Sequence, residues 1–224
     1  MSYQIYLVED EQNLNRLLTS YLQKEGWKVS SFHTGGEARE AMCIKPHLWI
    51  LDIMLPDMDG YELISEIKEV SPQVPVVFIS ARDSDLDRII GLEKGSDDYL
   101  PKPFLPRELI MRVSKILERV YGSAFRIEKQ KKTSELSPYT VEWGKRKVLK
   151  DNLKIDLTSK EYDLLLLLLE NRGNALSREQ LLQHLWGNLY YGSGRVVDDL
   201  VRRLRKKMPE IEIETIYGYG YRLV

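Results

Sequence analysis

Five side chains in the first half of the sequence could together handle a phosphoryl group. They are three acids, a hydroxyl and an amine: Glu9, Asp10, Asp52, Ser80 and Lys102. Carboxylate oxygens suit Mg²⁺, which keeps several waters and tolerates a bound phosphate. A carboxylate can also be the nucleophile, which gives an aspartyl phosphate, while a lysine neutralises the incoming charge. The sequence therefore indicates Mg²⁺-assisted phosphate chemistry, provided that the fold brings these side chains together.

The elements that must position these side chains alternate between strand-like and helix-like patterns. Apolar runs predict strands at 5–8, 28–32, 48–51, 74–79 and 98–100, with amphipathic stretches between and after them. Five such units in succession predict an α/β domain with a doubly wound, five-stranded parallel sheet. With the strand order 2-1-3-4-5, the five side chains converge beyond the carboxyl ends of the strands. Asp52 is the candidate nucleophile because it ends the central and most apolar strand.

A simpler reading remains open, because acids at strand ends are often only solvated. An enzyme using the same crevice is a second alternative, such as a Mg²⁺-dependent phosphatase of the haloacid dehalogenase type. That family needs a second aspartate two residues beyond the nucleophile, and Met54 occupies that position here.

Charge divides the 224 residues into two parts. Residues 1–122 hold 14 Lys and Arg against 20 Asp and Glu, a net −6, whereas residues 139–224 hold 15 against 12, a net +3. The intervening segment 123–138 is polar and aperiodic, and is predicted to be a linker. An acidic half joined to a basic half suggests two tasks, one of which involves a polyanion.

The second half predicts a smaller α+β domain. Short strands are expected at 139–143, 147–149 and 155–157, followed by helices near 159–172, 177–186 and 194–208 and by a hairpin at 213–224. In the last helix, residues such as Val197 and Leu204 form an apolar face, and the opposite face carries mostly cations together with Asp199. Such a helix suits a DNA groove lined with phosphates, although a solvated charged face is the usual alternative.

Residues 1–121 resemble the CheY-like receiver domain of bacterial two-component response regulators. The resemblance is carried by Glu9-Asp10, Asp52 with Met54-Leu55-Pro56 and Gly60, Ser80-Ala81-Arg82, Gly95-Ser96-Asp97-Asp98-Tyr99 and Lys102-Pro103-Phe104. It implies that a membrane sensor histidine kinase phosphorylates Asp52.

The same resemblance assigns further roles around that aspartate. It implies Mg²⁺ ligation by Asp10, Asp52 and the backbone carbonyl of Met54, with Glu9 close by. Lys102 would contact the phosphoryl group, and the Lys102-Pro103 bond would be cis. Ser80 and Tyr99 would form the switch pair.

Residues 139–224 resemble the winged helix-turn-helix output domain of the OmpR/PhoB family. The motifs that carry this resemblance are Leu157 to Leu165, Ser177-Arg178, Leu185-Trp186-Gly187, Arg195 to Asp198, Val201 to Lys207 and Gly218 to Arg222. It implies that helix 194–208 enters the major groove of promoter DNA and that hairpin 213–224 is the wing. Loop 188–194 would be available to RNA polymerase.

The expected DNA contacts lie on that helix and that wing. Arg203 would lie nearest the bases, and Arg195, Arg205 and Thr215 would bind phosphates. Arg202, Lys206 and Tyr217 complete the expected set. The wing tip of the family often carries arginine where this chain has Tyr217, and a neutral phenol is not drawn into a narrow minor groove as a guanidinium is.

Charged residues between 85 and 119 are expected to form a symmetric homodimer after phosphorylation, as the family does. The expected face comprises Arg88, Glu93, Asp97, Asp98, Glu108, Arg112 and Arg119, with Arg88–Glu108 and Asp98–Arg112 as pairs across the interface. Within the family, the segments 46–61, 102–110 and 195–210 are most similar to the CssR-type regulators of Gram-positive bacteria. This similarity implies a response to secretion or envelope stress.

Several classes of protein are disfavoured. The sequence shows no secretory signal and no apolar run long enough to span a bilayer, so membrane insertion is not expected. Cys43 is the one cysteine, which fits a reducing, cytoplasmic location. We expect a regulator rather than an enzyme, with an RNA-binding or protein-docking output as the remaining alternative.

Overall fold

The computed structural model describes residues 2–82, 84–122, 133–187 and 194–224. The chain divides into two compact units, Met1–Val120 and Tyr121–Val224, and each unit is described by itself. None of the helices formed by the described residues is long and apolar enough to cross a bilayer.

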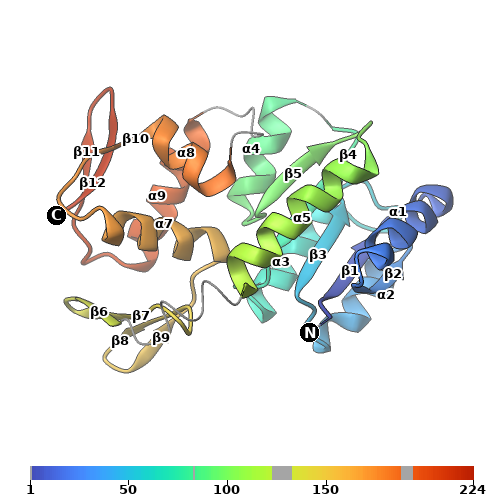
Figure 1. Cartoon of the computed structure of the whole chain (residues 1–224), viewed down its shortest axis with the longest axis horizontal. Helices are drawn as coiled ribbons and strands as arrows, with labels where there is room; N and C mark the ends of the chain where they lie inside the picture. Colours follow the sequence, from blue (N-terminus) through green and yellow to red (C-terminus); the bar gives the residue numbers. More distant parts are fainter. Residues whose placement is uncertain (1, 83, 123–132, 188–193) are drawn as a thin grey trace. The chain divides into compact units, whose positions relative to one another are not determined.

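The first unit is a five-stranded parallel sheet in the order β2-β1-β3-β4-β5, as the sequence predicted. Helices follow the strands and cover both faces, with α5 over one face and α3 over the other (Figure 1). In chain order the elements are β1 (Gln4–Val8), α1 (Gln12–Lys24), β2 (Lys28–Phe32), α2 (Gly35–Glu40), the 3-10 helix η1 (Ala41–Cys43), β3 (Leu48–Asp52), α3 (Gly60–Val70), β4 (Val76–Ser80), α4 (Asp85–Glu93), β5 (Asp98–Pro101) and α5 (Pro106–Tyr121).

Burial explains why β3 and β4 have apolar sequences without alternation. Both strands are buried along their whole length, because helices cover the sheet on its two faces. On one face, Trp49 and Phe78 pack with Ile64 of α3 in a single apolar cluster. The strand register then aligns the strand ends, since Val8 of β1 is level with Leu51 of β3. The residues that follow these two positions therefore emerge at the same edge of the sheet.

The described residues of the second unit form two antiparallel sheets and three helices. One sheet has the order β6-β7-β8-β9, and the other has the order β10-β12-β11. The elements are β6 (Thr133–Leu136), β7 (Tyr139–Glu142), β8 (Lys147–Lys150), β9 (Leu153–Ile155), α7 (Ser159–Glu170), β10 (Leu176–Ser177), α8 (Arg178–Trp186), α9 (Arg195–Lys207), β11 (Ile213–Ile216) and β12 (Gly220–Leu223).

Helix starts in the second unit follow the capping boxes in its sequence. The Thr158 hydroxyl accepts a hydrogen bond from Glu161 N–H, and the Glu161 carboxylate accepts one from Thr158 N–H. Ser177 and Gln180 repeat this arrangement at α8. Each box satisfies backbone N–H groups that a helix otherwise leaves unpaired. The apolar face predicted for the third helix is buried in α9, where α9 packs against α7.

The segment predicted as a linker contains a strand. Residues 133–136 form β6, which pairs antiparallel with β7 and places Leu136 beside Tyr139. The sequence does not predict strand β6, because the residues of β6 are mostly polar and its pairing with β7 comes from backbone hydrogen bonds. Residues 123–132 lie outside the described part of the chain, so the boundaries 1–122, 123–138 and 139–224 are otherwise still predictions.

Candidate functional site

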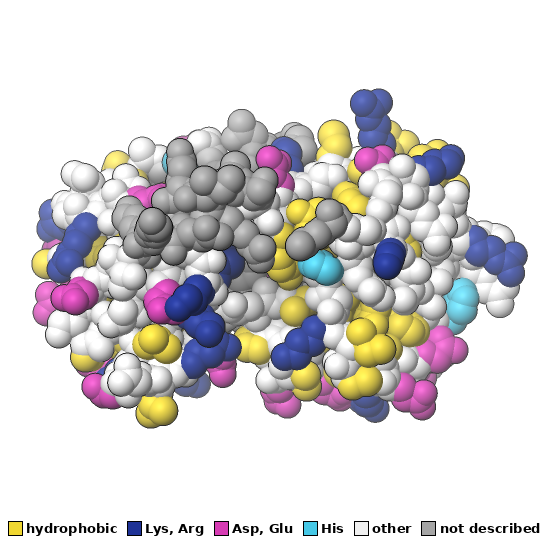
Figure 2. Space-filling view, turned by 60° about the horizontal axis from the view of Figure 1, so that its bottom comes forward, with side chains coloured by type: hydrophobic (Ala, Val, Ile, Leu, Met, Phe, Trp, Pro, Cys, Tyr) yellow, Lys and Arg dark blue, Asp and Glu magenta, His cyan; other side chains and the backbone are white. Residues whose placement is uncertain are grey.

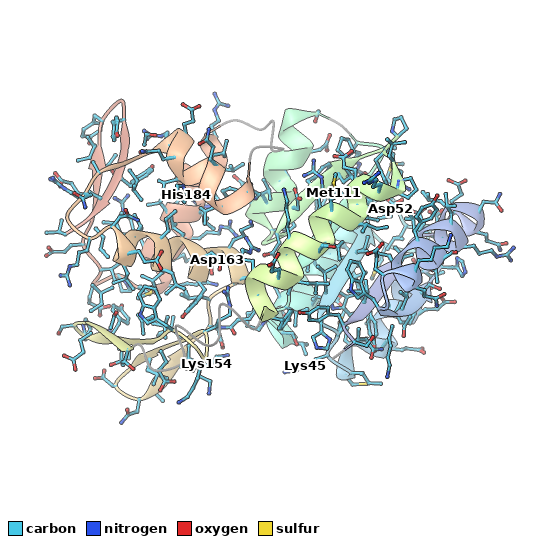
Figure 3. All side chains as sticks on the ribbon, in the orientation of Figure 1. Lys45, Asp52, Met111, Lys154, Asp163 and His184 are labelled. Atoms are coloured by element: carbon cyan, nitrogen blue, oxygen red, sulfur yellow. The ribbon has the colours of Figure 1, made fainter. Side chains whose placement is uncertain are left out.

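Three carboxylates converge at the carboxyl edge of the parallel sheet. One oxygen from each of Glu9, Asp10 and Asp52 lies within 4.8 Å of the others. Glu9 and Asp10 directly follow β1, and Asp52 ends β3, where Figure 3 labels it. Asp10 is exposed, whereas Glu9 and Asp52 are 0% and 3% exposed. The cluster thus combines two shielded acids with one that faces solvent.

The Lys102 ammonium bridges the two shielded acids. Its Nζ lies 2.6 Å from Asp52 Oδ2 and 2.8 Å from Glu9 Oε2. Two features hold this lysine in place: the Lys102 amide donates to the Ser80 carbonyl at 2.6 Å, and the Lys102-Pro103 peptide bond is cis, as predicted. The sequence-predicted convergence of Glu9, Asp10, Asp52 and Lys102 is therefore present in the structure.

Burial and charge act in opposite directions on these groups. Burial raises the pKa of the Glu9 carboxyl and the neighbouring Asp52 charge adds to that rise, against the hydrogen bond from Lys102. Burial alone would lower the pKa of Lys102, but its hydrogen bonds and charge interactions with Asp52 and Glu9 outweigh this and raise it. The ammonium is therefore held in its charged form, ready to meet an anion.

The loop after β3 fixes the orientation of Asp52. The Met54 amide donates to Asp52 Oδ1 at 2.9 Å, so the two oxygens have different partners. Gly60, which begins α3, is packed against this turn. A Cβ at Gly60 would lie 2.5 Å from the Asp52 carbonyl oxygen, so only glycine allows α3 to start here.

The oxygen-rich donor set fits a hard divalent cation. All three side chains offer carboxylate oxygens, and one of them, Asp10, is accessible from solvent. Mg²⁺ prefers such ligands and retains waters in its remaining positions. The residues present are therefore compatible with a Mg²⁺ site that includes Asp10 and Asp52.

The predicted switch residues both contact the backbone of Arg82. Ser80 is buried, and its Oγ accepts a hydrogen bond from the Arg82 amide at 3.1 Å. The Tyr99 ring is buried beside Phe78, and its hydroxyl donates to the Arg82 carbonyl at 2.6 Å. The structure thus connects Ser80 and Tyr99 through a single residue between them.

Arg82 was not among the predicted site residues, although it follows Ser80 in the motif. Its guanidinium lies 3.7 Å from the Asp59 carboxylate and 5.9 Å from the Tyr61 ring centre. Tyr61 in turn donates to the Asp87 carbonyl of α4 at 3.0 Å. These contacts join the loop after Asp52 to the loop before α4. No residue-type signal marks them in the sequence, because they depend on how two loops meet.

The predicted dimer face is occupied by ion pairs within the chain. Arg112 lies 3.0 Å from its predicted partner Asp98 and 2.8 Å from Glu108, which was predicted to pair with Arg88. Asp97 was predicted on this surface but is buried, with Arg119 at 3.0 Å. The Asp97 carboxylate also accepts a hydrogen bond from the Val76 amide, which makes Asp97 part of the β4–β5 packing. Glu93 is exposed. The side chain of Arg88 lies outside the described residues.

Helix α9 presents three exposed cations. Two other predicted contact residues of this helix, Arg203 and Arg205, have partners within the chain. Arg195, Arg202 and Lys206 are exposed. Arg203 is only 17% exposed, with its Nε 2.9 Å from Asp199 Oδ2. Asp199, which the sequence placed on the outer face, is 8% exposed. The carboxylate is therefore buried beside Arg202 and Arg203, which corrects the outward placement that helical periodicity predicted.

The hairpin β11–β12 carries the remaining predicted contacts. Arg205 donates to the Ile213 carbonyl and, at 3.0 Å, to the Thr215 hydroxyl. Tyr217 at the tip is 94% exposed, beside Gly218 with φ of +72°. The hairpin therefore projects an unshielded phenol from its turn, and Arg205 ties the base of the hairpin to α9.

A cluster centred on Tyr221 was not predicted. The Tyr221 hydroxyl donates to Asp198 Oδ1 at 2.7 Å, and Arg178 Nε donates to the same oxygen at 2.7 Å. Arg178 begins α8, Asp198 lies in α9 and Tyr221 lies in β12, so the cluster joins all three elements. The guanidinium of Arg178 and that of Arg205 also lie near the Tyr221 ring.

On the face shown in Figure 2, Lys and Arg side chains are interspersed with Asp and Glu side chains. Of loop 188–194, residues 188–193 lie outside the described part of the chain, so the expected polymerase contact has no structural description.

Family models match both halves of the chain. The model described as "Response regulator receiver domain" matches residues 5–114. The model described as "Transcriptional regulatory protein, C terminal" matches residues 152–223. The first range contains the carboxylate cluster, and the second contains α9 and the hairpin.

Full-length relatives have the same two parts. The chain is 60% identical to the transcriptional regulatory protein CssR of Bacillus subtilis, over 100% of this chain and 99% of CssR. It is 35% identical to the transcriptional regulatory protein SrrA of Staphylococcus aureus, over 99% of this chain and 95% of SrrA. The response regulator DrrB of Thermotoga maritima, an OmpR/PhoB homologue of solved structure, is 32% identical, with a TM-score of 0.54 and 100% of both chains covered. The chain therefore belongs to the OmpR/PhoB family of two-component response regulators, and within it CssR-type regulators are its relatives, as the sequence motifs predicted.

Proposed function

We propose that the chain is switched by phosphorylation of Asp52 and that the switched form binds promoter DNA. The phosphoryl donor is the phosphohistidine of a membrane sensor kinase. An Asp52 oxygen attacks phosphorus, the phosphorus–nitrogen bond breaks, and the histidine ring leaves with its electron pair and takes up a proton. The observation that carries this proposal is the contact between Asp52 and Lys102, 2.6 Å apart in a shielded crevice.

Each neighbour of Asp52 has a defined part in this step. Lys102 gives up part of its contact with Asp52 and Glu9 and meets the oxygens of the incoming group. The Asp10 and Asp52 carboxylates and the Met54 carbonyl would hold Mg²⁺, with Glu9 beside them. Bound Mg²⁺ would supply further neutralisation of the phosphoryl oxygens. The Met54 amide keeps Asp52 oriented for attack.

The phosphoryl signal leaves the crevice through Ser80, Arg82 and Tyr99. When the Ser80 hydroxyl turns to the phosphoryl group, it loses the hydrogen bond that it accepts from the Arg82 amide. The carbonyl of the same residue, Arg82, accepts a hydrogen bond from the Tyr99 hydroxyl. The loop that contains Arg82 and the Tyr99 ring therefore move together. The exposed side of α4, β5 and α5 then pairs with a second copy of the chain.

In that homodimer, Arg112 and Glu108 exchange partners within their own chain for partners across the two-fold axis. The proposed cross-subunit pairs are Arg88 with Glu108 and Asp98 with Arg112, supported by Glu93 and Arg119. The dimer presents two copies of α9 to two major-groove half-sites.

The proposed DNA surface consists of α9 and the hairpin. The exposed cations Arg195, Arg202 and Lys206 meet the groove directly. Arg203, Arg205 and Thr215 contribute after releasing their present partners, and Tyr217 meets the backbone beside the groove. Loop 188–194 contacts RNA polymerase. The proposed stimulus is secretion or envelope stress, as expected of the CssR-type subgroup.

Phosphoryl uptake tests the proposal. The full chain is incubated with acetyl phosphate and Mg²⁺, and intact mass and sedimentation are measured. We expect wild type to gain one phosphoryl group and to dimerise, because the Asp52 carboxylate is the proposed nucleophile and Lys102 lies beside it. Asp52→Asn should do neither, and Mg²⁺ removal should abolish uptake. Glu69→Gln, an exposed acid of α3, is the matched control and should behave as wild type. Equal uptake by Asp52→Asn would overturn the assignment.

A further inference from the structure

An acidic residue lies within the stripe of cations that α9 would turn toward DNA. At about 100° per residue, Arg195, Asp199, Arg202 and Lys206 fall within about 60° of one another around the helix. A carboxylate on such a face repels phosphates, so a simple phosphate-binding helix would not carry it. DNA binding by the family does not by itself explain why an acid occupies this position of α9.

The contacts of Asp199 show how its charge is used. Its Oδ1 accepts from Arg202, with Nε at 3.1 Å and a second guanidinium nitrogen also bonded. Its Oδ2 lies 2.9 Å from Arg203 Nε. Both carboxylate oxygens therefore serve neighbouring arginines, one turn further along the helix. The two side chains cover Asp199 and leave it almost inaccessible.

The two arginines are held in different directions. Arg202 keeps 68% of its side chain exposed, so it points to solvent from its anchor on Asp199. Arg203 turns toward the body of the unit, where Glu161 lies 3.9 Å away. Glu161 is itself buried and also pairs with Lys207 at 2.7 Å. Asp199 thus holds two adjacent guanidiniums in different directions.

We propose that Asp199 is a positioning residue for base reading, which restrains Arg202 and Arg203 and weakens their attraction to the DNA backbone. The proposal rests on the DNA-binding function proposed above. Arginine loses much side-chain entropy when it binds in one geometry, and a pre-positioned guanidinium loses less. An arginine tied to a carboxylate also gains less from a phosphate, which any sequence offers, than from a base edge that matches its fixed direction.

Direct reading of a base by Asp199 is the competing explanation. A carboxylate can accept a hydrogen bond from the amino group of cytosine. In the present structure Asp199 is 8% exposed and Arg203 Nε lies 2.9 Å from its Oδ2, so a cytosine amino group could approach only after the arginines move aside. The observed contacts therefore favour positioning.

The experiment uses the full chain, phosphorylated with acetyl phosphate, and a pool of random DNA duplexes. Selection gives the base preference of wild type, Asp199→Ala, Asp199→Asn, Arg202→Ala and Arg203→Ala. Affinity for one unselected random duplex is measured over a range of salt concentrations. Glu142→Ala is the control, because it removes a carboxylate from another i,i+3 ion pair of the same unit, with Lys145.

We expect Asp199→Ala to lose preference at the same base positions as Arg202→Ala or Arg203→Ala. Its affinity for the random duplex should rise several-fold, with a salt dependence steeper by roughly one phosphate contact. Asp199→Asn should be intermediate, since its amide oxygen can still accept from one arginine. Glu142→Ala should retain the wild-type preference.

Other results overturn the inference in distinguishable ways. An unchanged preference in Asp199→Ala shows that the arginines need no positioning. Loss of one cytosine preference in Asp199→Ala, but not in either arginine variant, establishes direct reading. Parallel loss of all duplex binding and of thermal stability shows a structural role only. If wild type enriches no sequence, the proposed DNA-binding function itself is wrong.

Discussion

Lys102 compensates two acids that have almost no contact with water. Glu9 is fully buried and Asp52 nearly so, and the Lys102 ammonium contacts both. Removing one member of a shielded ion pair leaves an uncompensated charge, which destabilises a protein by about 3 kcal/mol. The ammonium that is proposed to meet a phosphoryl group therefore also stabilises the unphosphorylated fold.

Lys102→Met should lower the free energy of unfolding by about 3 kcal/mol in urea denaturation. Mg²⁺ should restore part of this loss, because it supplies positive charge to the same carboxylates. Lys115→Met on α5 is the control, since Lys115 is exposed, and it should change little. An equal loss in both variants, or no effect of Mg²⁺ on Lys102→Met, would contradict this account.

The pH dependence of that difference follows from the raised pKa of Lys102. The folded chain holds this proton more tightly than the unfolded chain, in which the pKa is near 10.5. The stability from Lys102 is therefore complete below 10.5 and is lost as pH rises through the folded pKa. The difference in unfolding free energy between wild type and Lys102→Met should be constant below 10.5 for as long as Glu9 stays ionised, and should shrink above 10.5.

Residue-level prediction succeeded where side chains are short and follow strand ends. Glu9, Asp10, Asp52 and Ser80 lie where the parallel strands end, and strand order alone brings them together. It was less informative for long side chains on helices. The direction of Cβ at Arg203 follows from helical periodicity, but the inward course of its guanidinium depends on Asp199 and Glu161, which no sequence pattern reveals.

At the scale of elements, the start of α3 is tied to the geometry of Asp52. A Cβ at Gly60 would lie 2.5 Å from the Asp52 carbonyl oxygen and 2.7 Å from Ile53 Cα. Both atoms belong to the backbone, so they cannot move away as the end of a flexible side chain could. The start of helix α3 and the backbone at Asp52 therefore depend on each other.

Gly60→Ala should lower stability by about 1–3 kcal/mol, the usual cost of forcing extra volume into a packed site. It should also slow phosphoryl uptake from acetyl phosphate, because the backbone at Asp52 must shift. The control is Gly194→Ala, whose Cβ would meet only the Arg178 side chain at 3.5 Å. We expect the control to stay within about 0.5 kcal/mol of wild type. Normal uptake in Gly60→Ala would show that the turn tolerates displacement.

The elements themselves were predicted best where the hydrophobic pattern was strong. The runs that became β3 and β4, and the apolar face of α9, follow directly from burial. Strand β6 was missed because Thr133, Ser134 and Glu135 offer no apolar alternation, and its pairing with β7 comes from backbone hydrogen bonds. Asp97 was placed on a surface because its charge suggested exposure, yet Arg119 allows it to be buried.

At the scale of the whole molecule, the proposed dimer requires ion pairs to change partners. Arg112 now holds Asp98 and Glu108 of its own chain. Because equivalent contacts can form across a two-fold axis, dimerisation exchanges these pairs and does not create charge interactions anew. The association energy must therefore come from the geometry that phosphorylation sets, which fits a reversible dimer.

Glu108→Arg should weaken phosphorylation-dependent dimerisation, because it places a second cation beside Arg112. Analytical ultracentrifugation of the acetyl phosphate-treated chain measures this, and phosphoryl uptake should remain near the wild-type level. Glu118→Arg, an exposed acid of the same helix outside the proposed face, is the matched control. If both variants dimerise like wild type, the proposed face is not the interface.

The Arg82 amide donates to Ser80 Oγ and the Arg82 carbonyl accepts from the Tyr99 hydroxyl, so both hydrogen bonds use only backbone groups of Arg82. Every amino acid except proline carries both groups. Evolution can therefore exchange the side chain at this position without cutting the connection between crevice and surface. The guanidinium contacts to Asp59 and Tyr61 can then vary independently of that backbone connection.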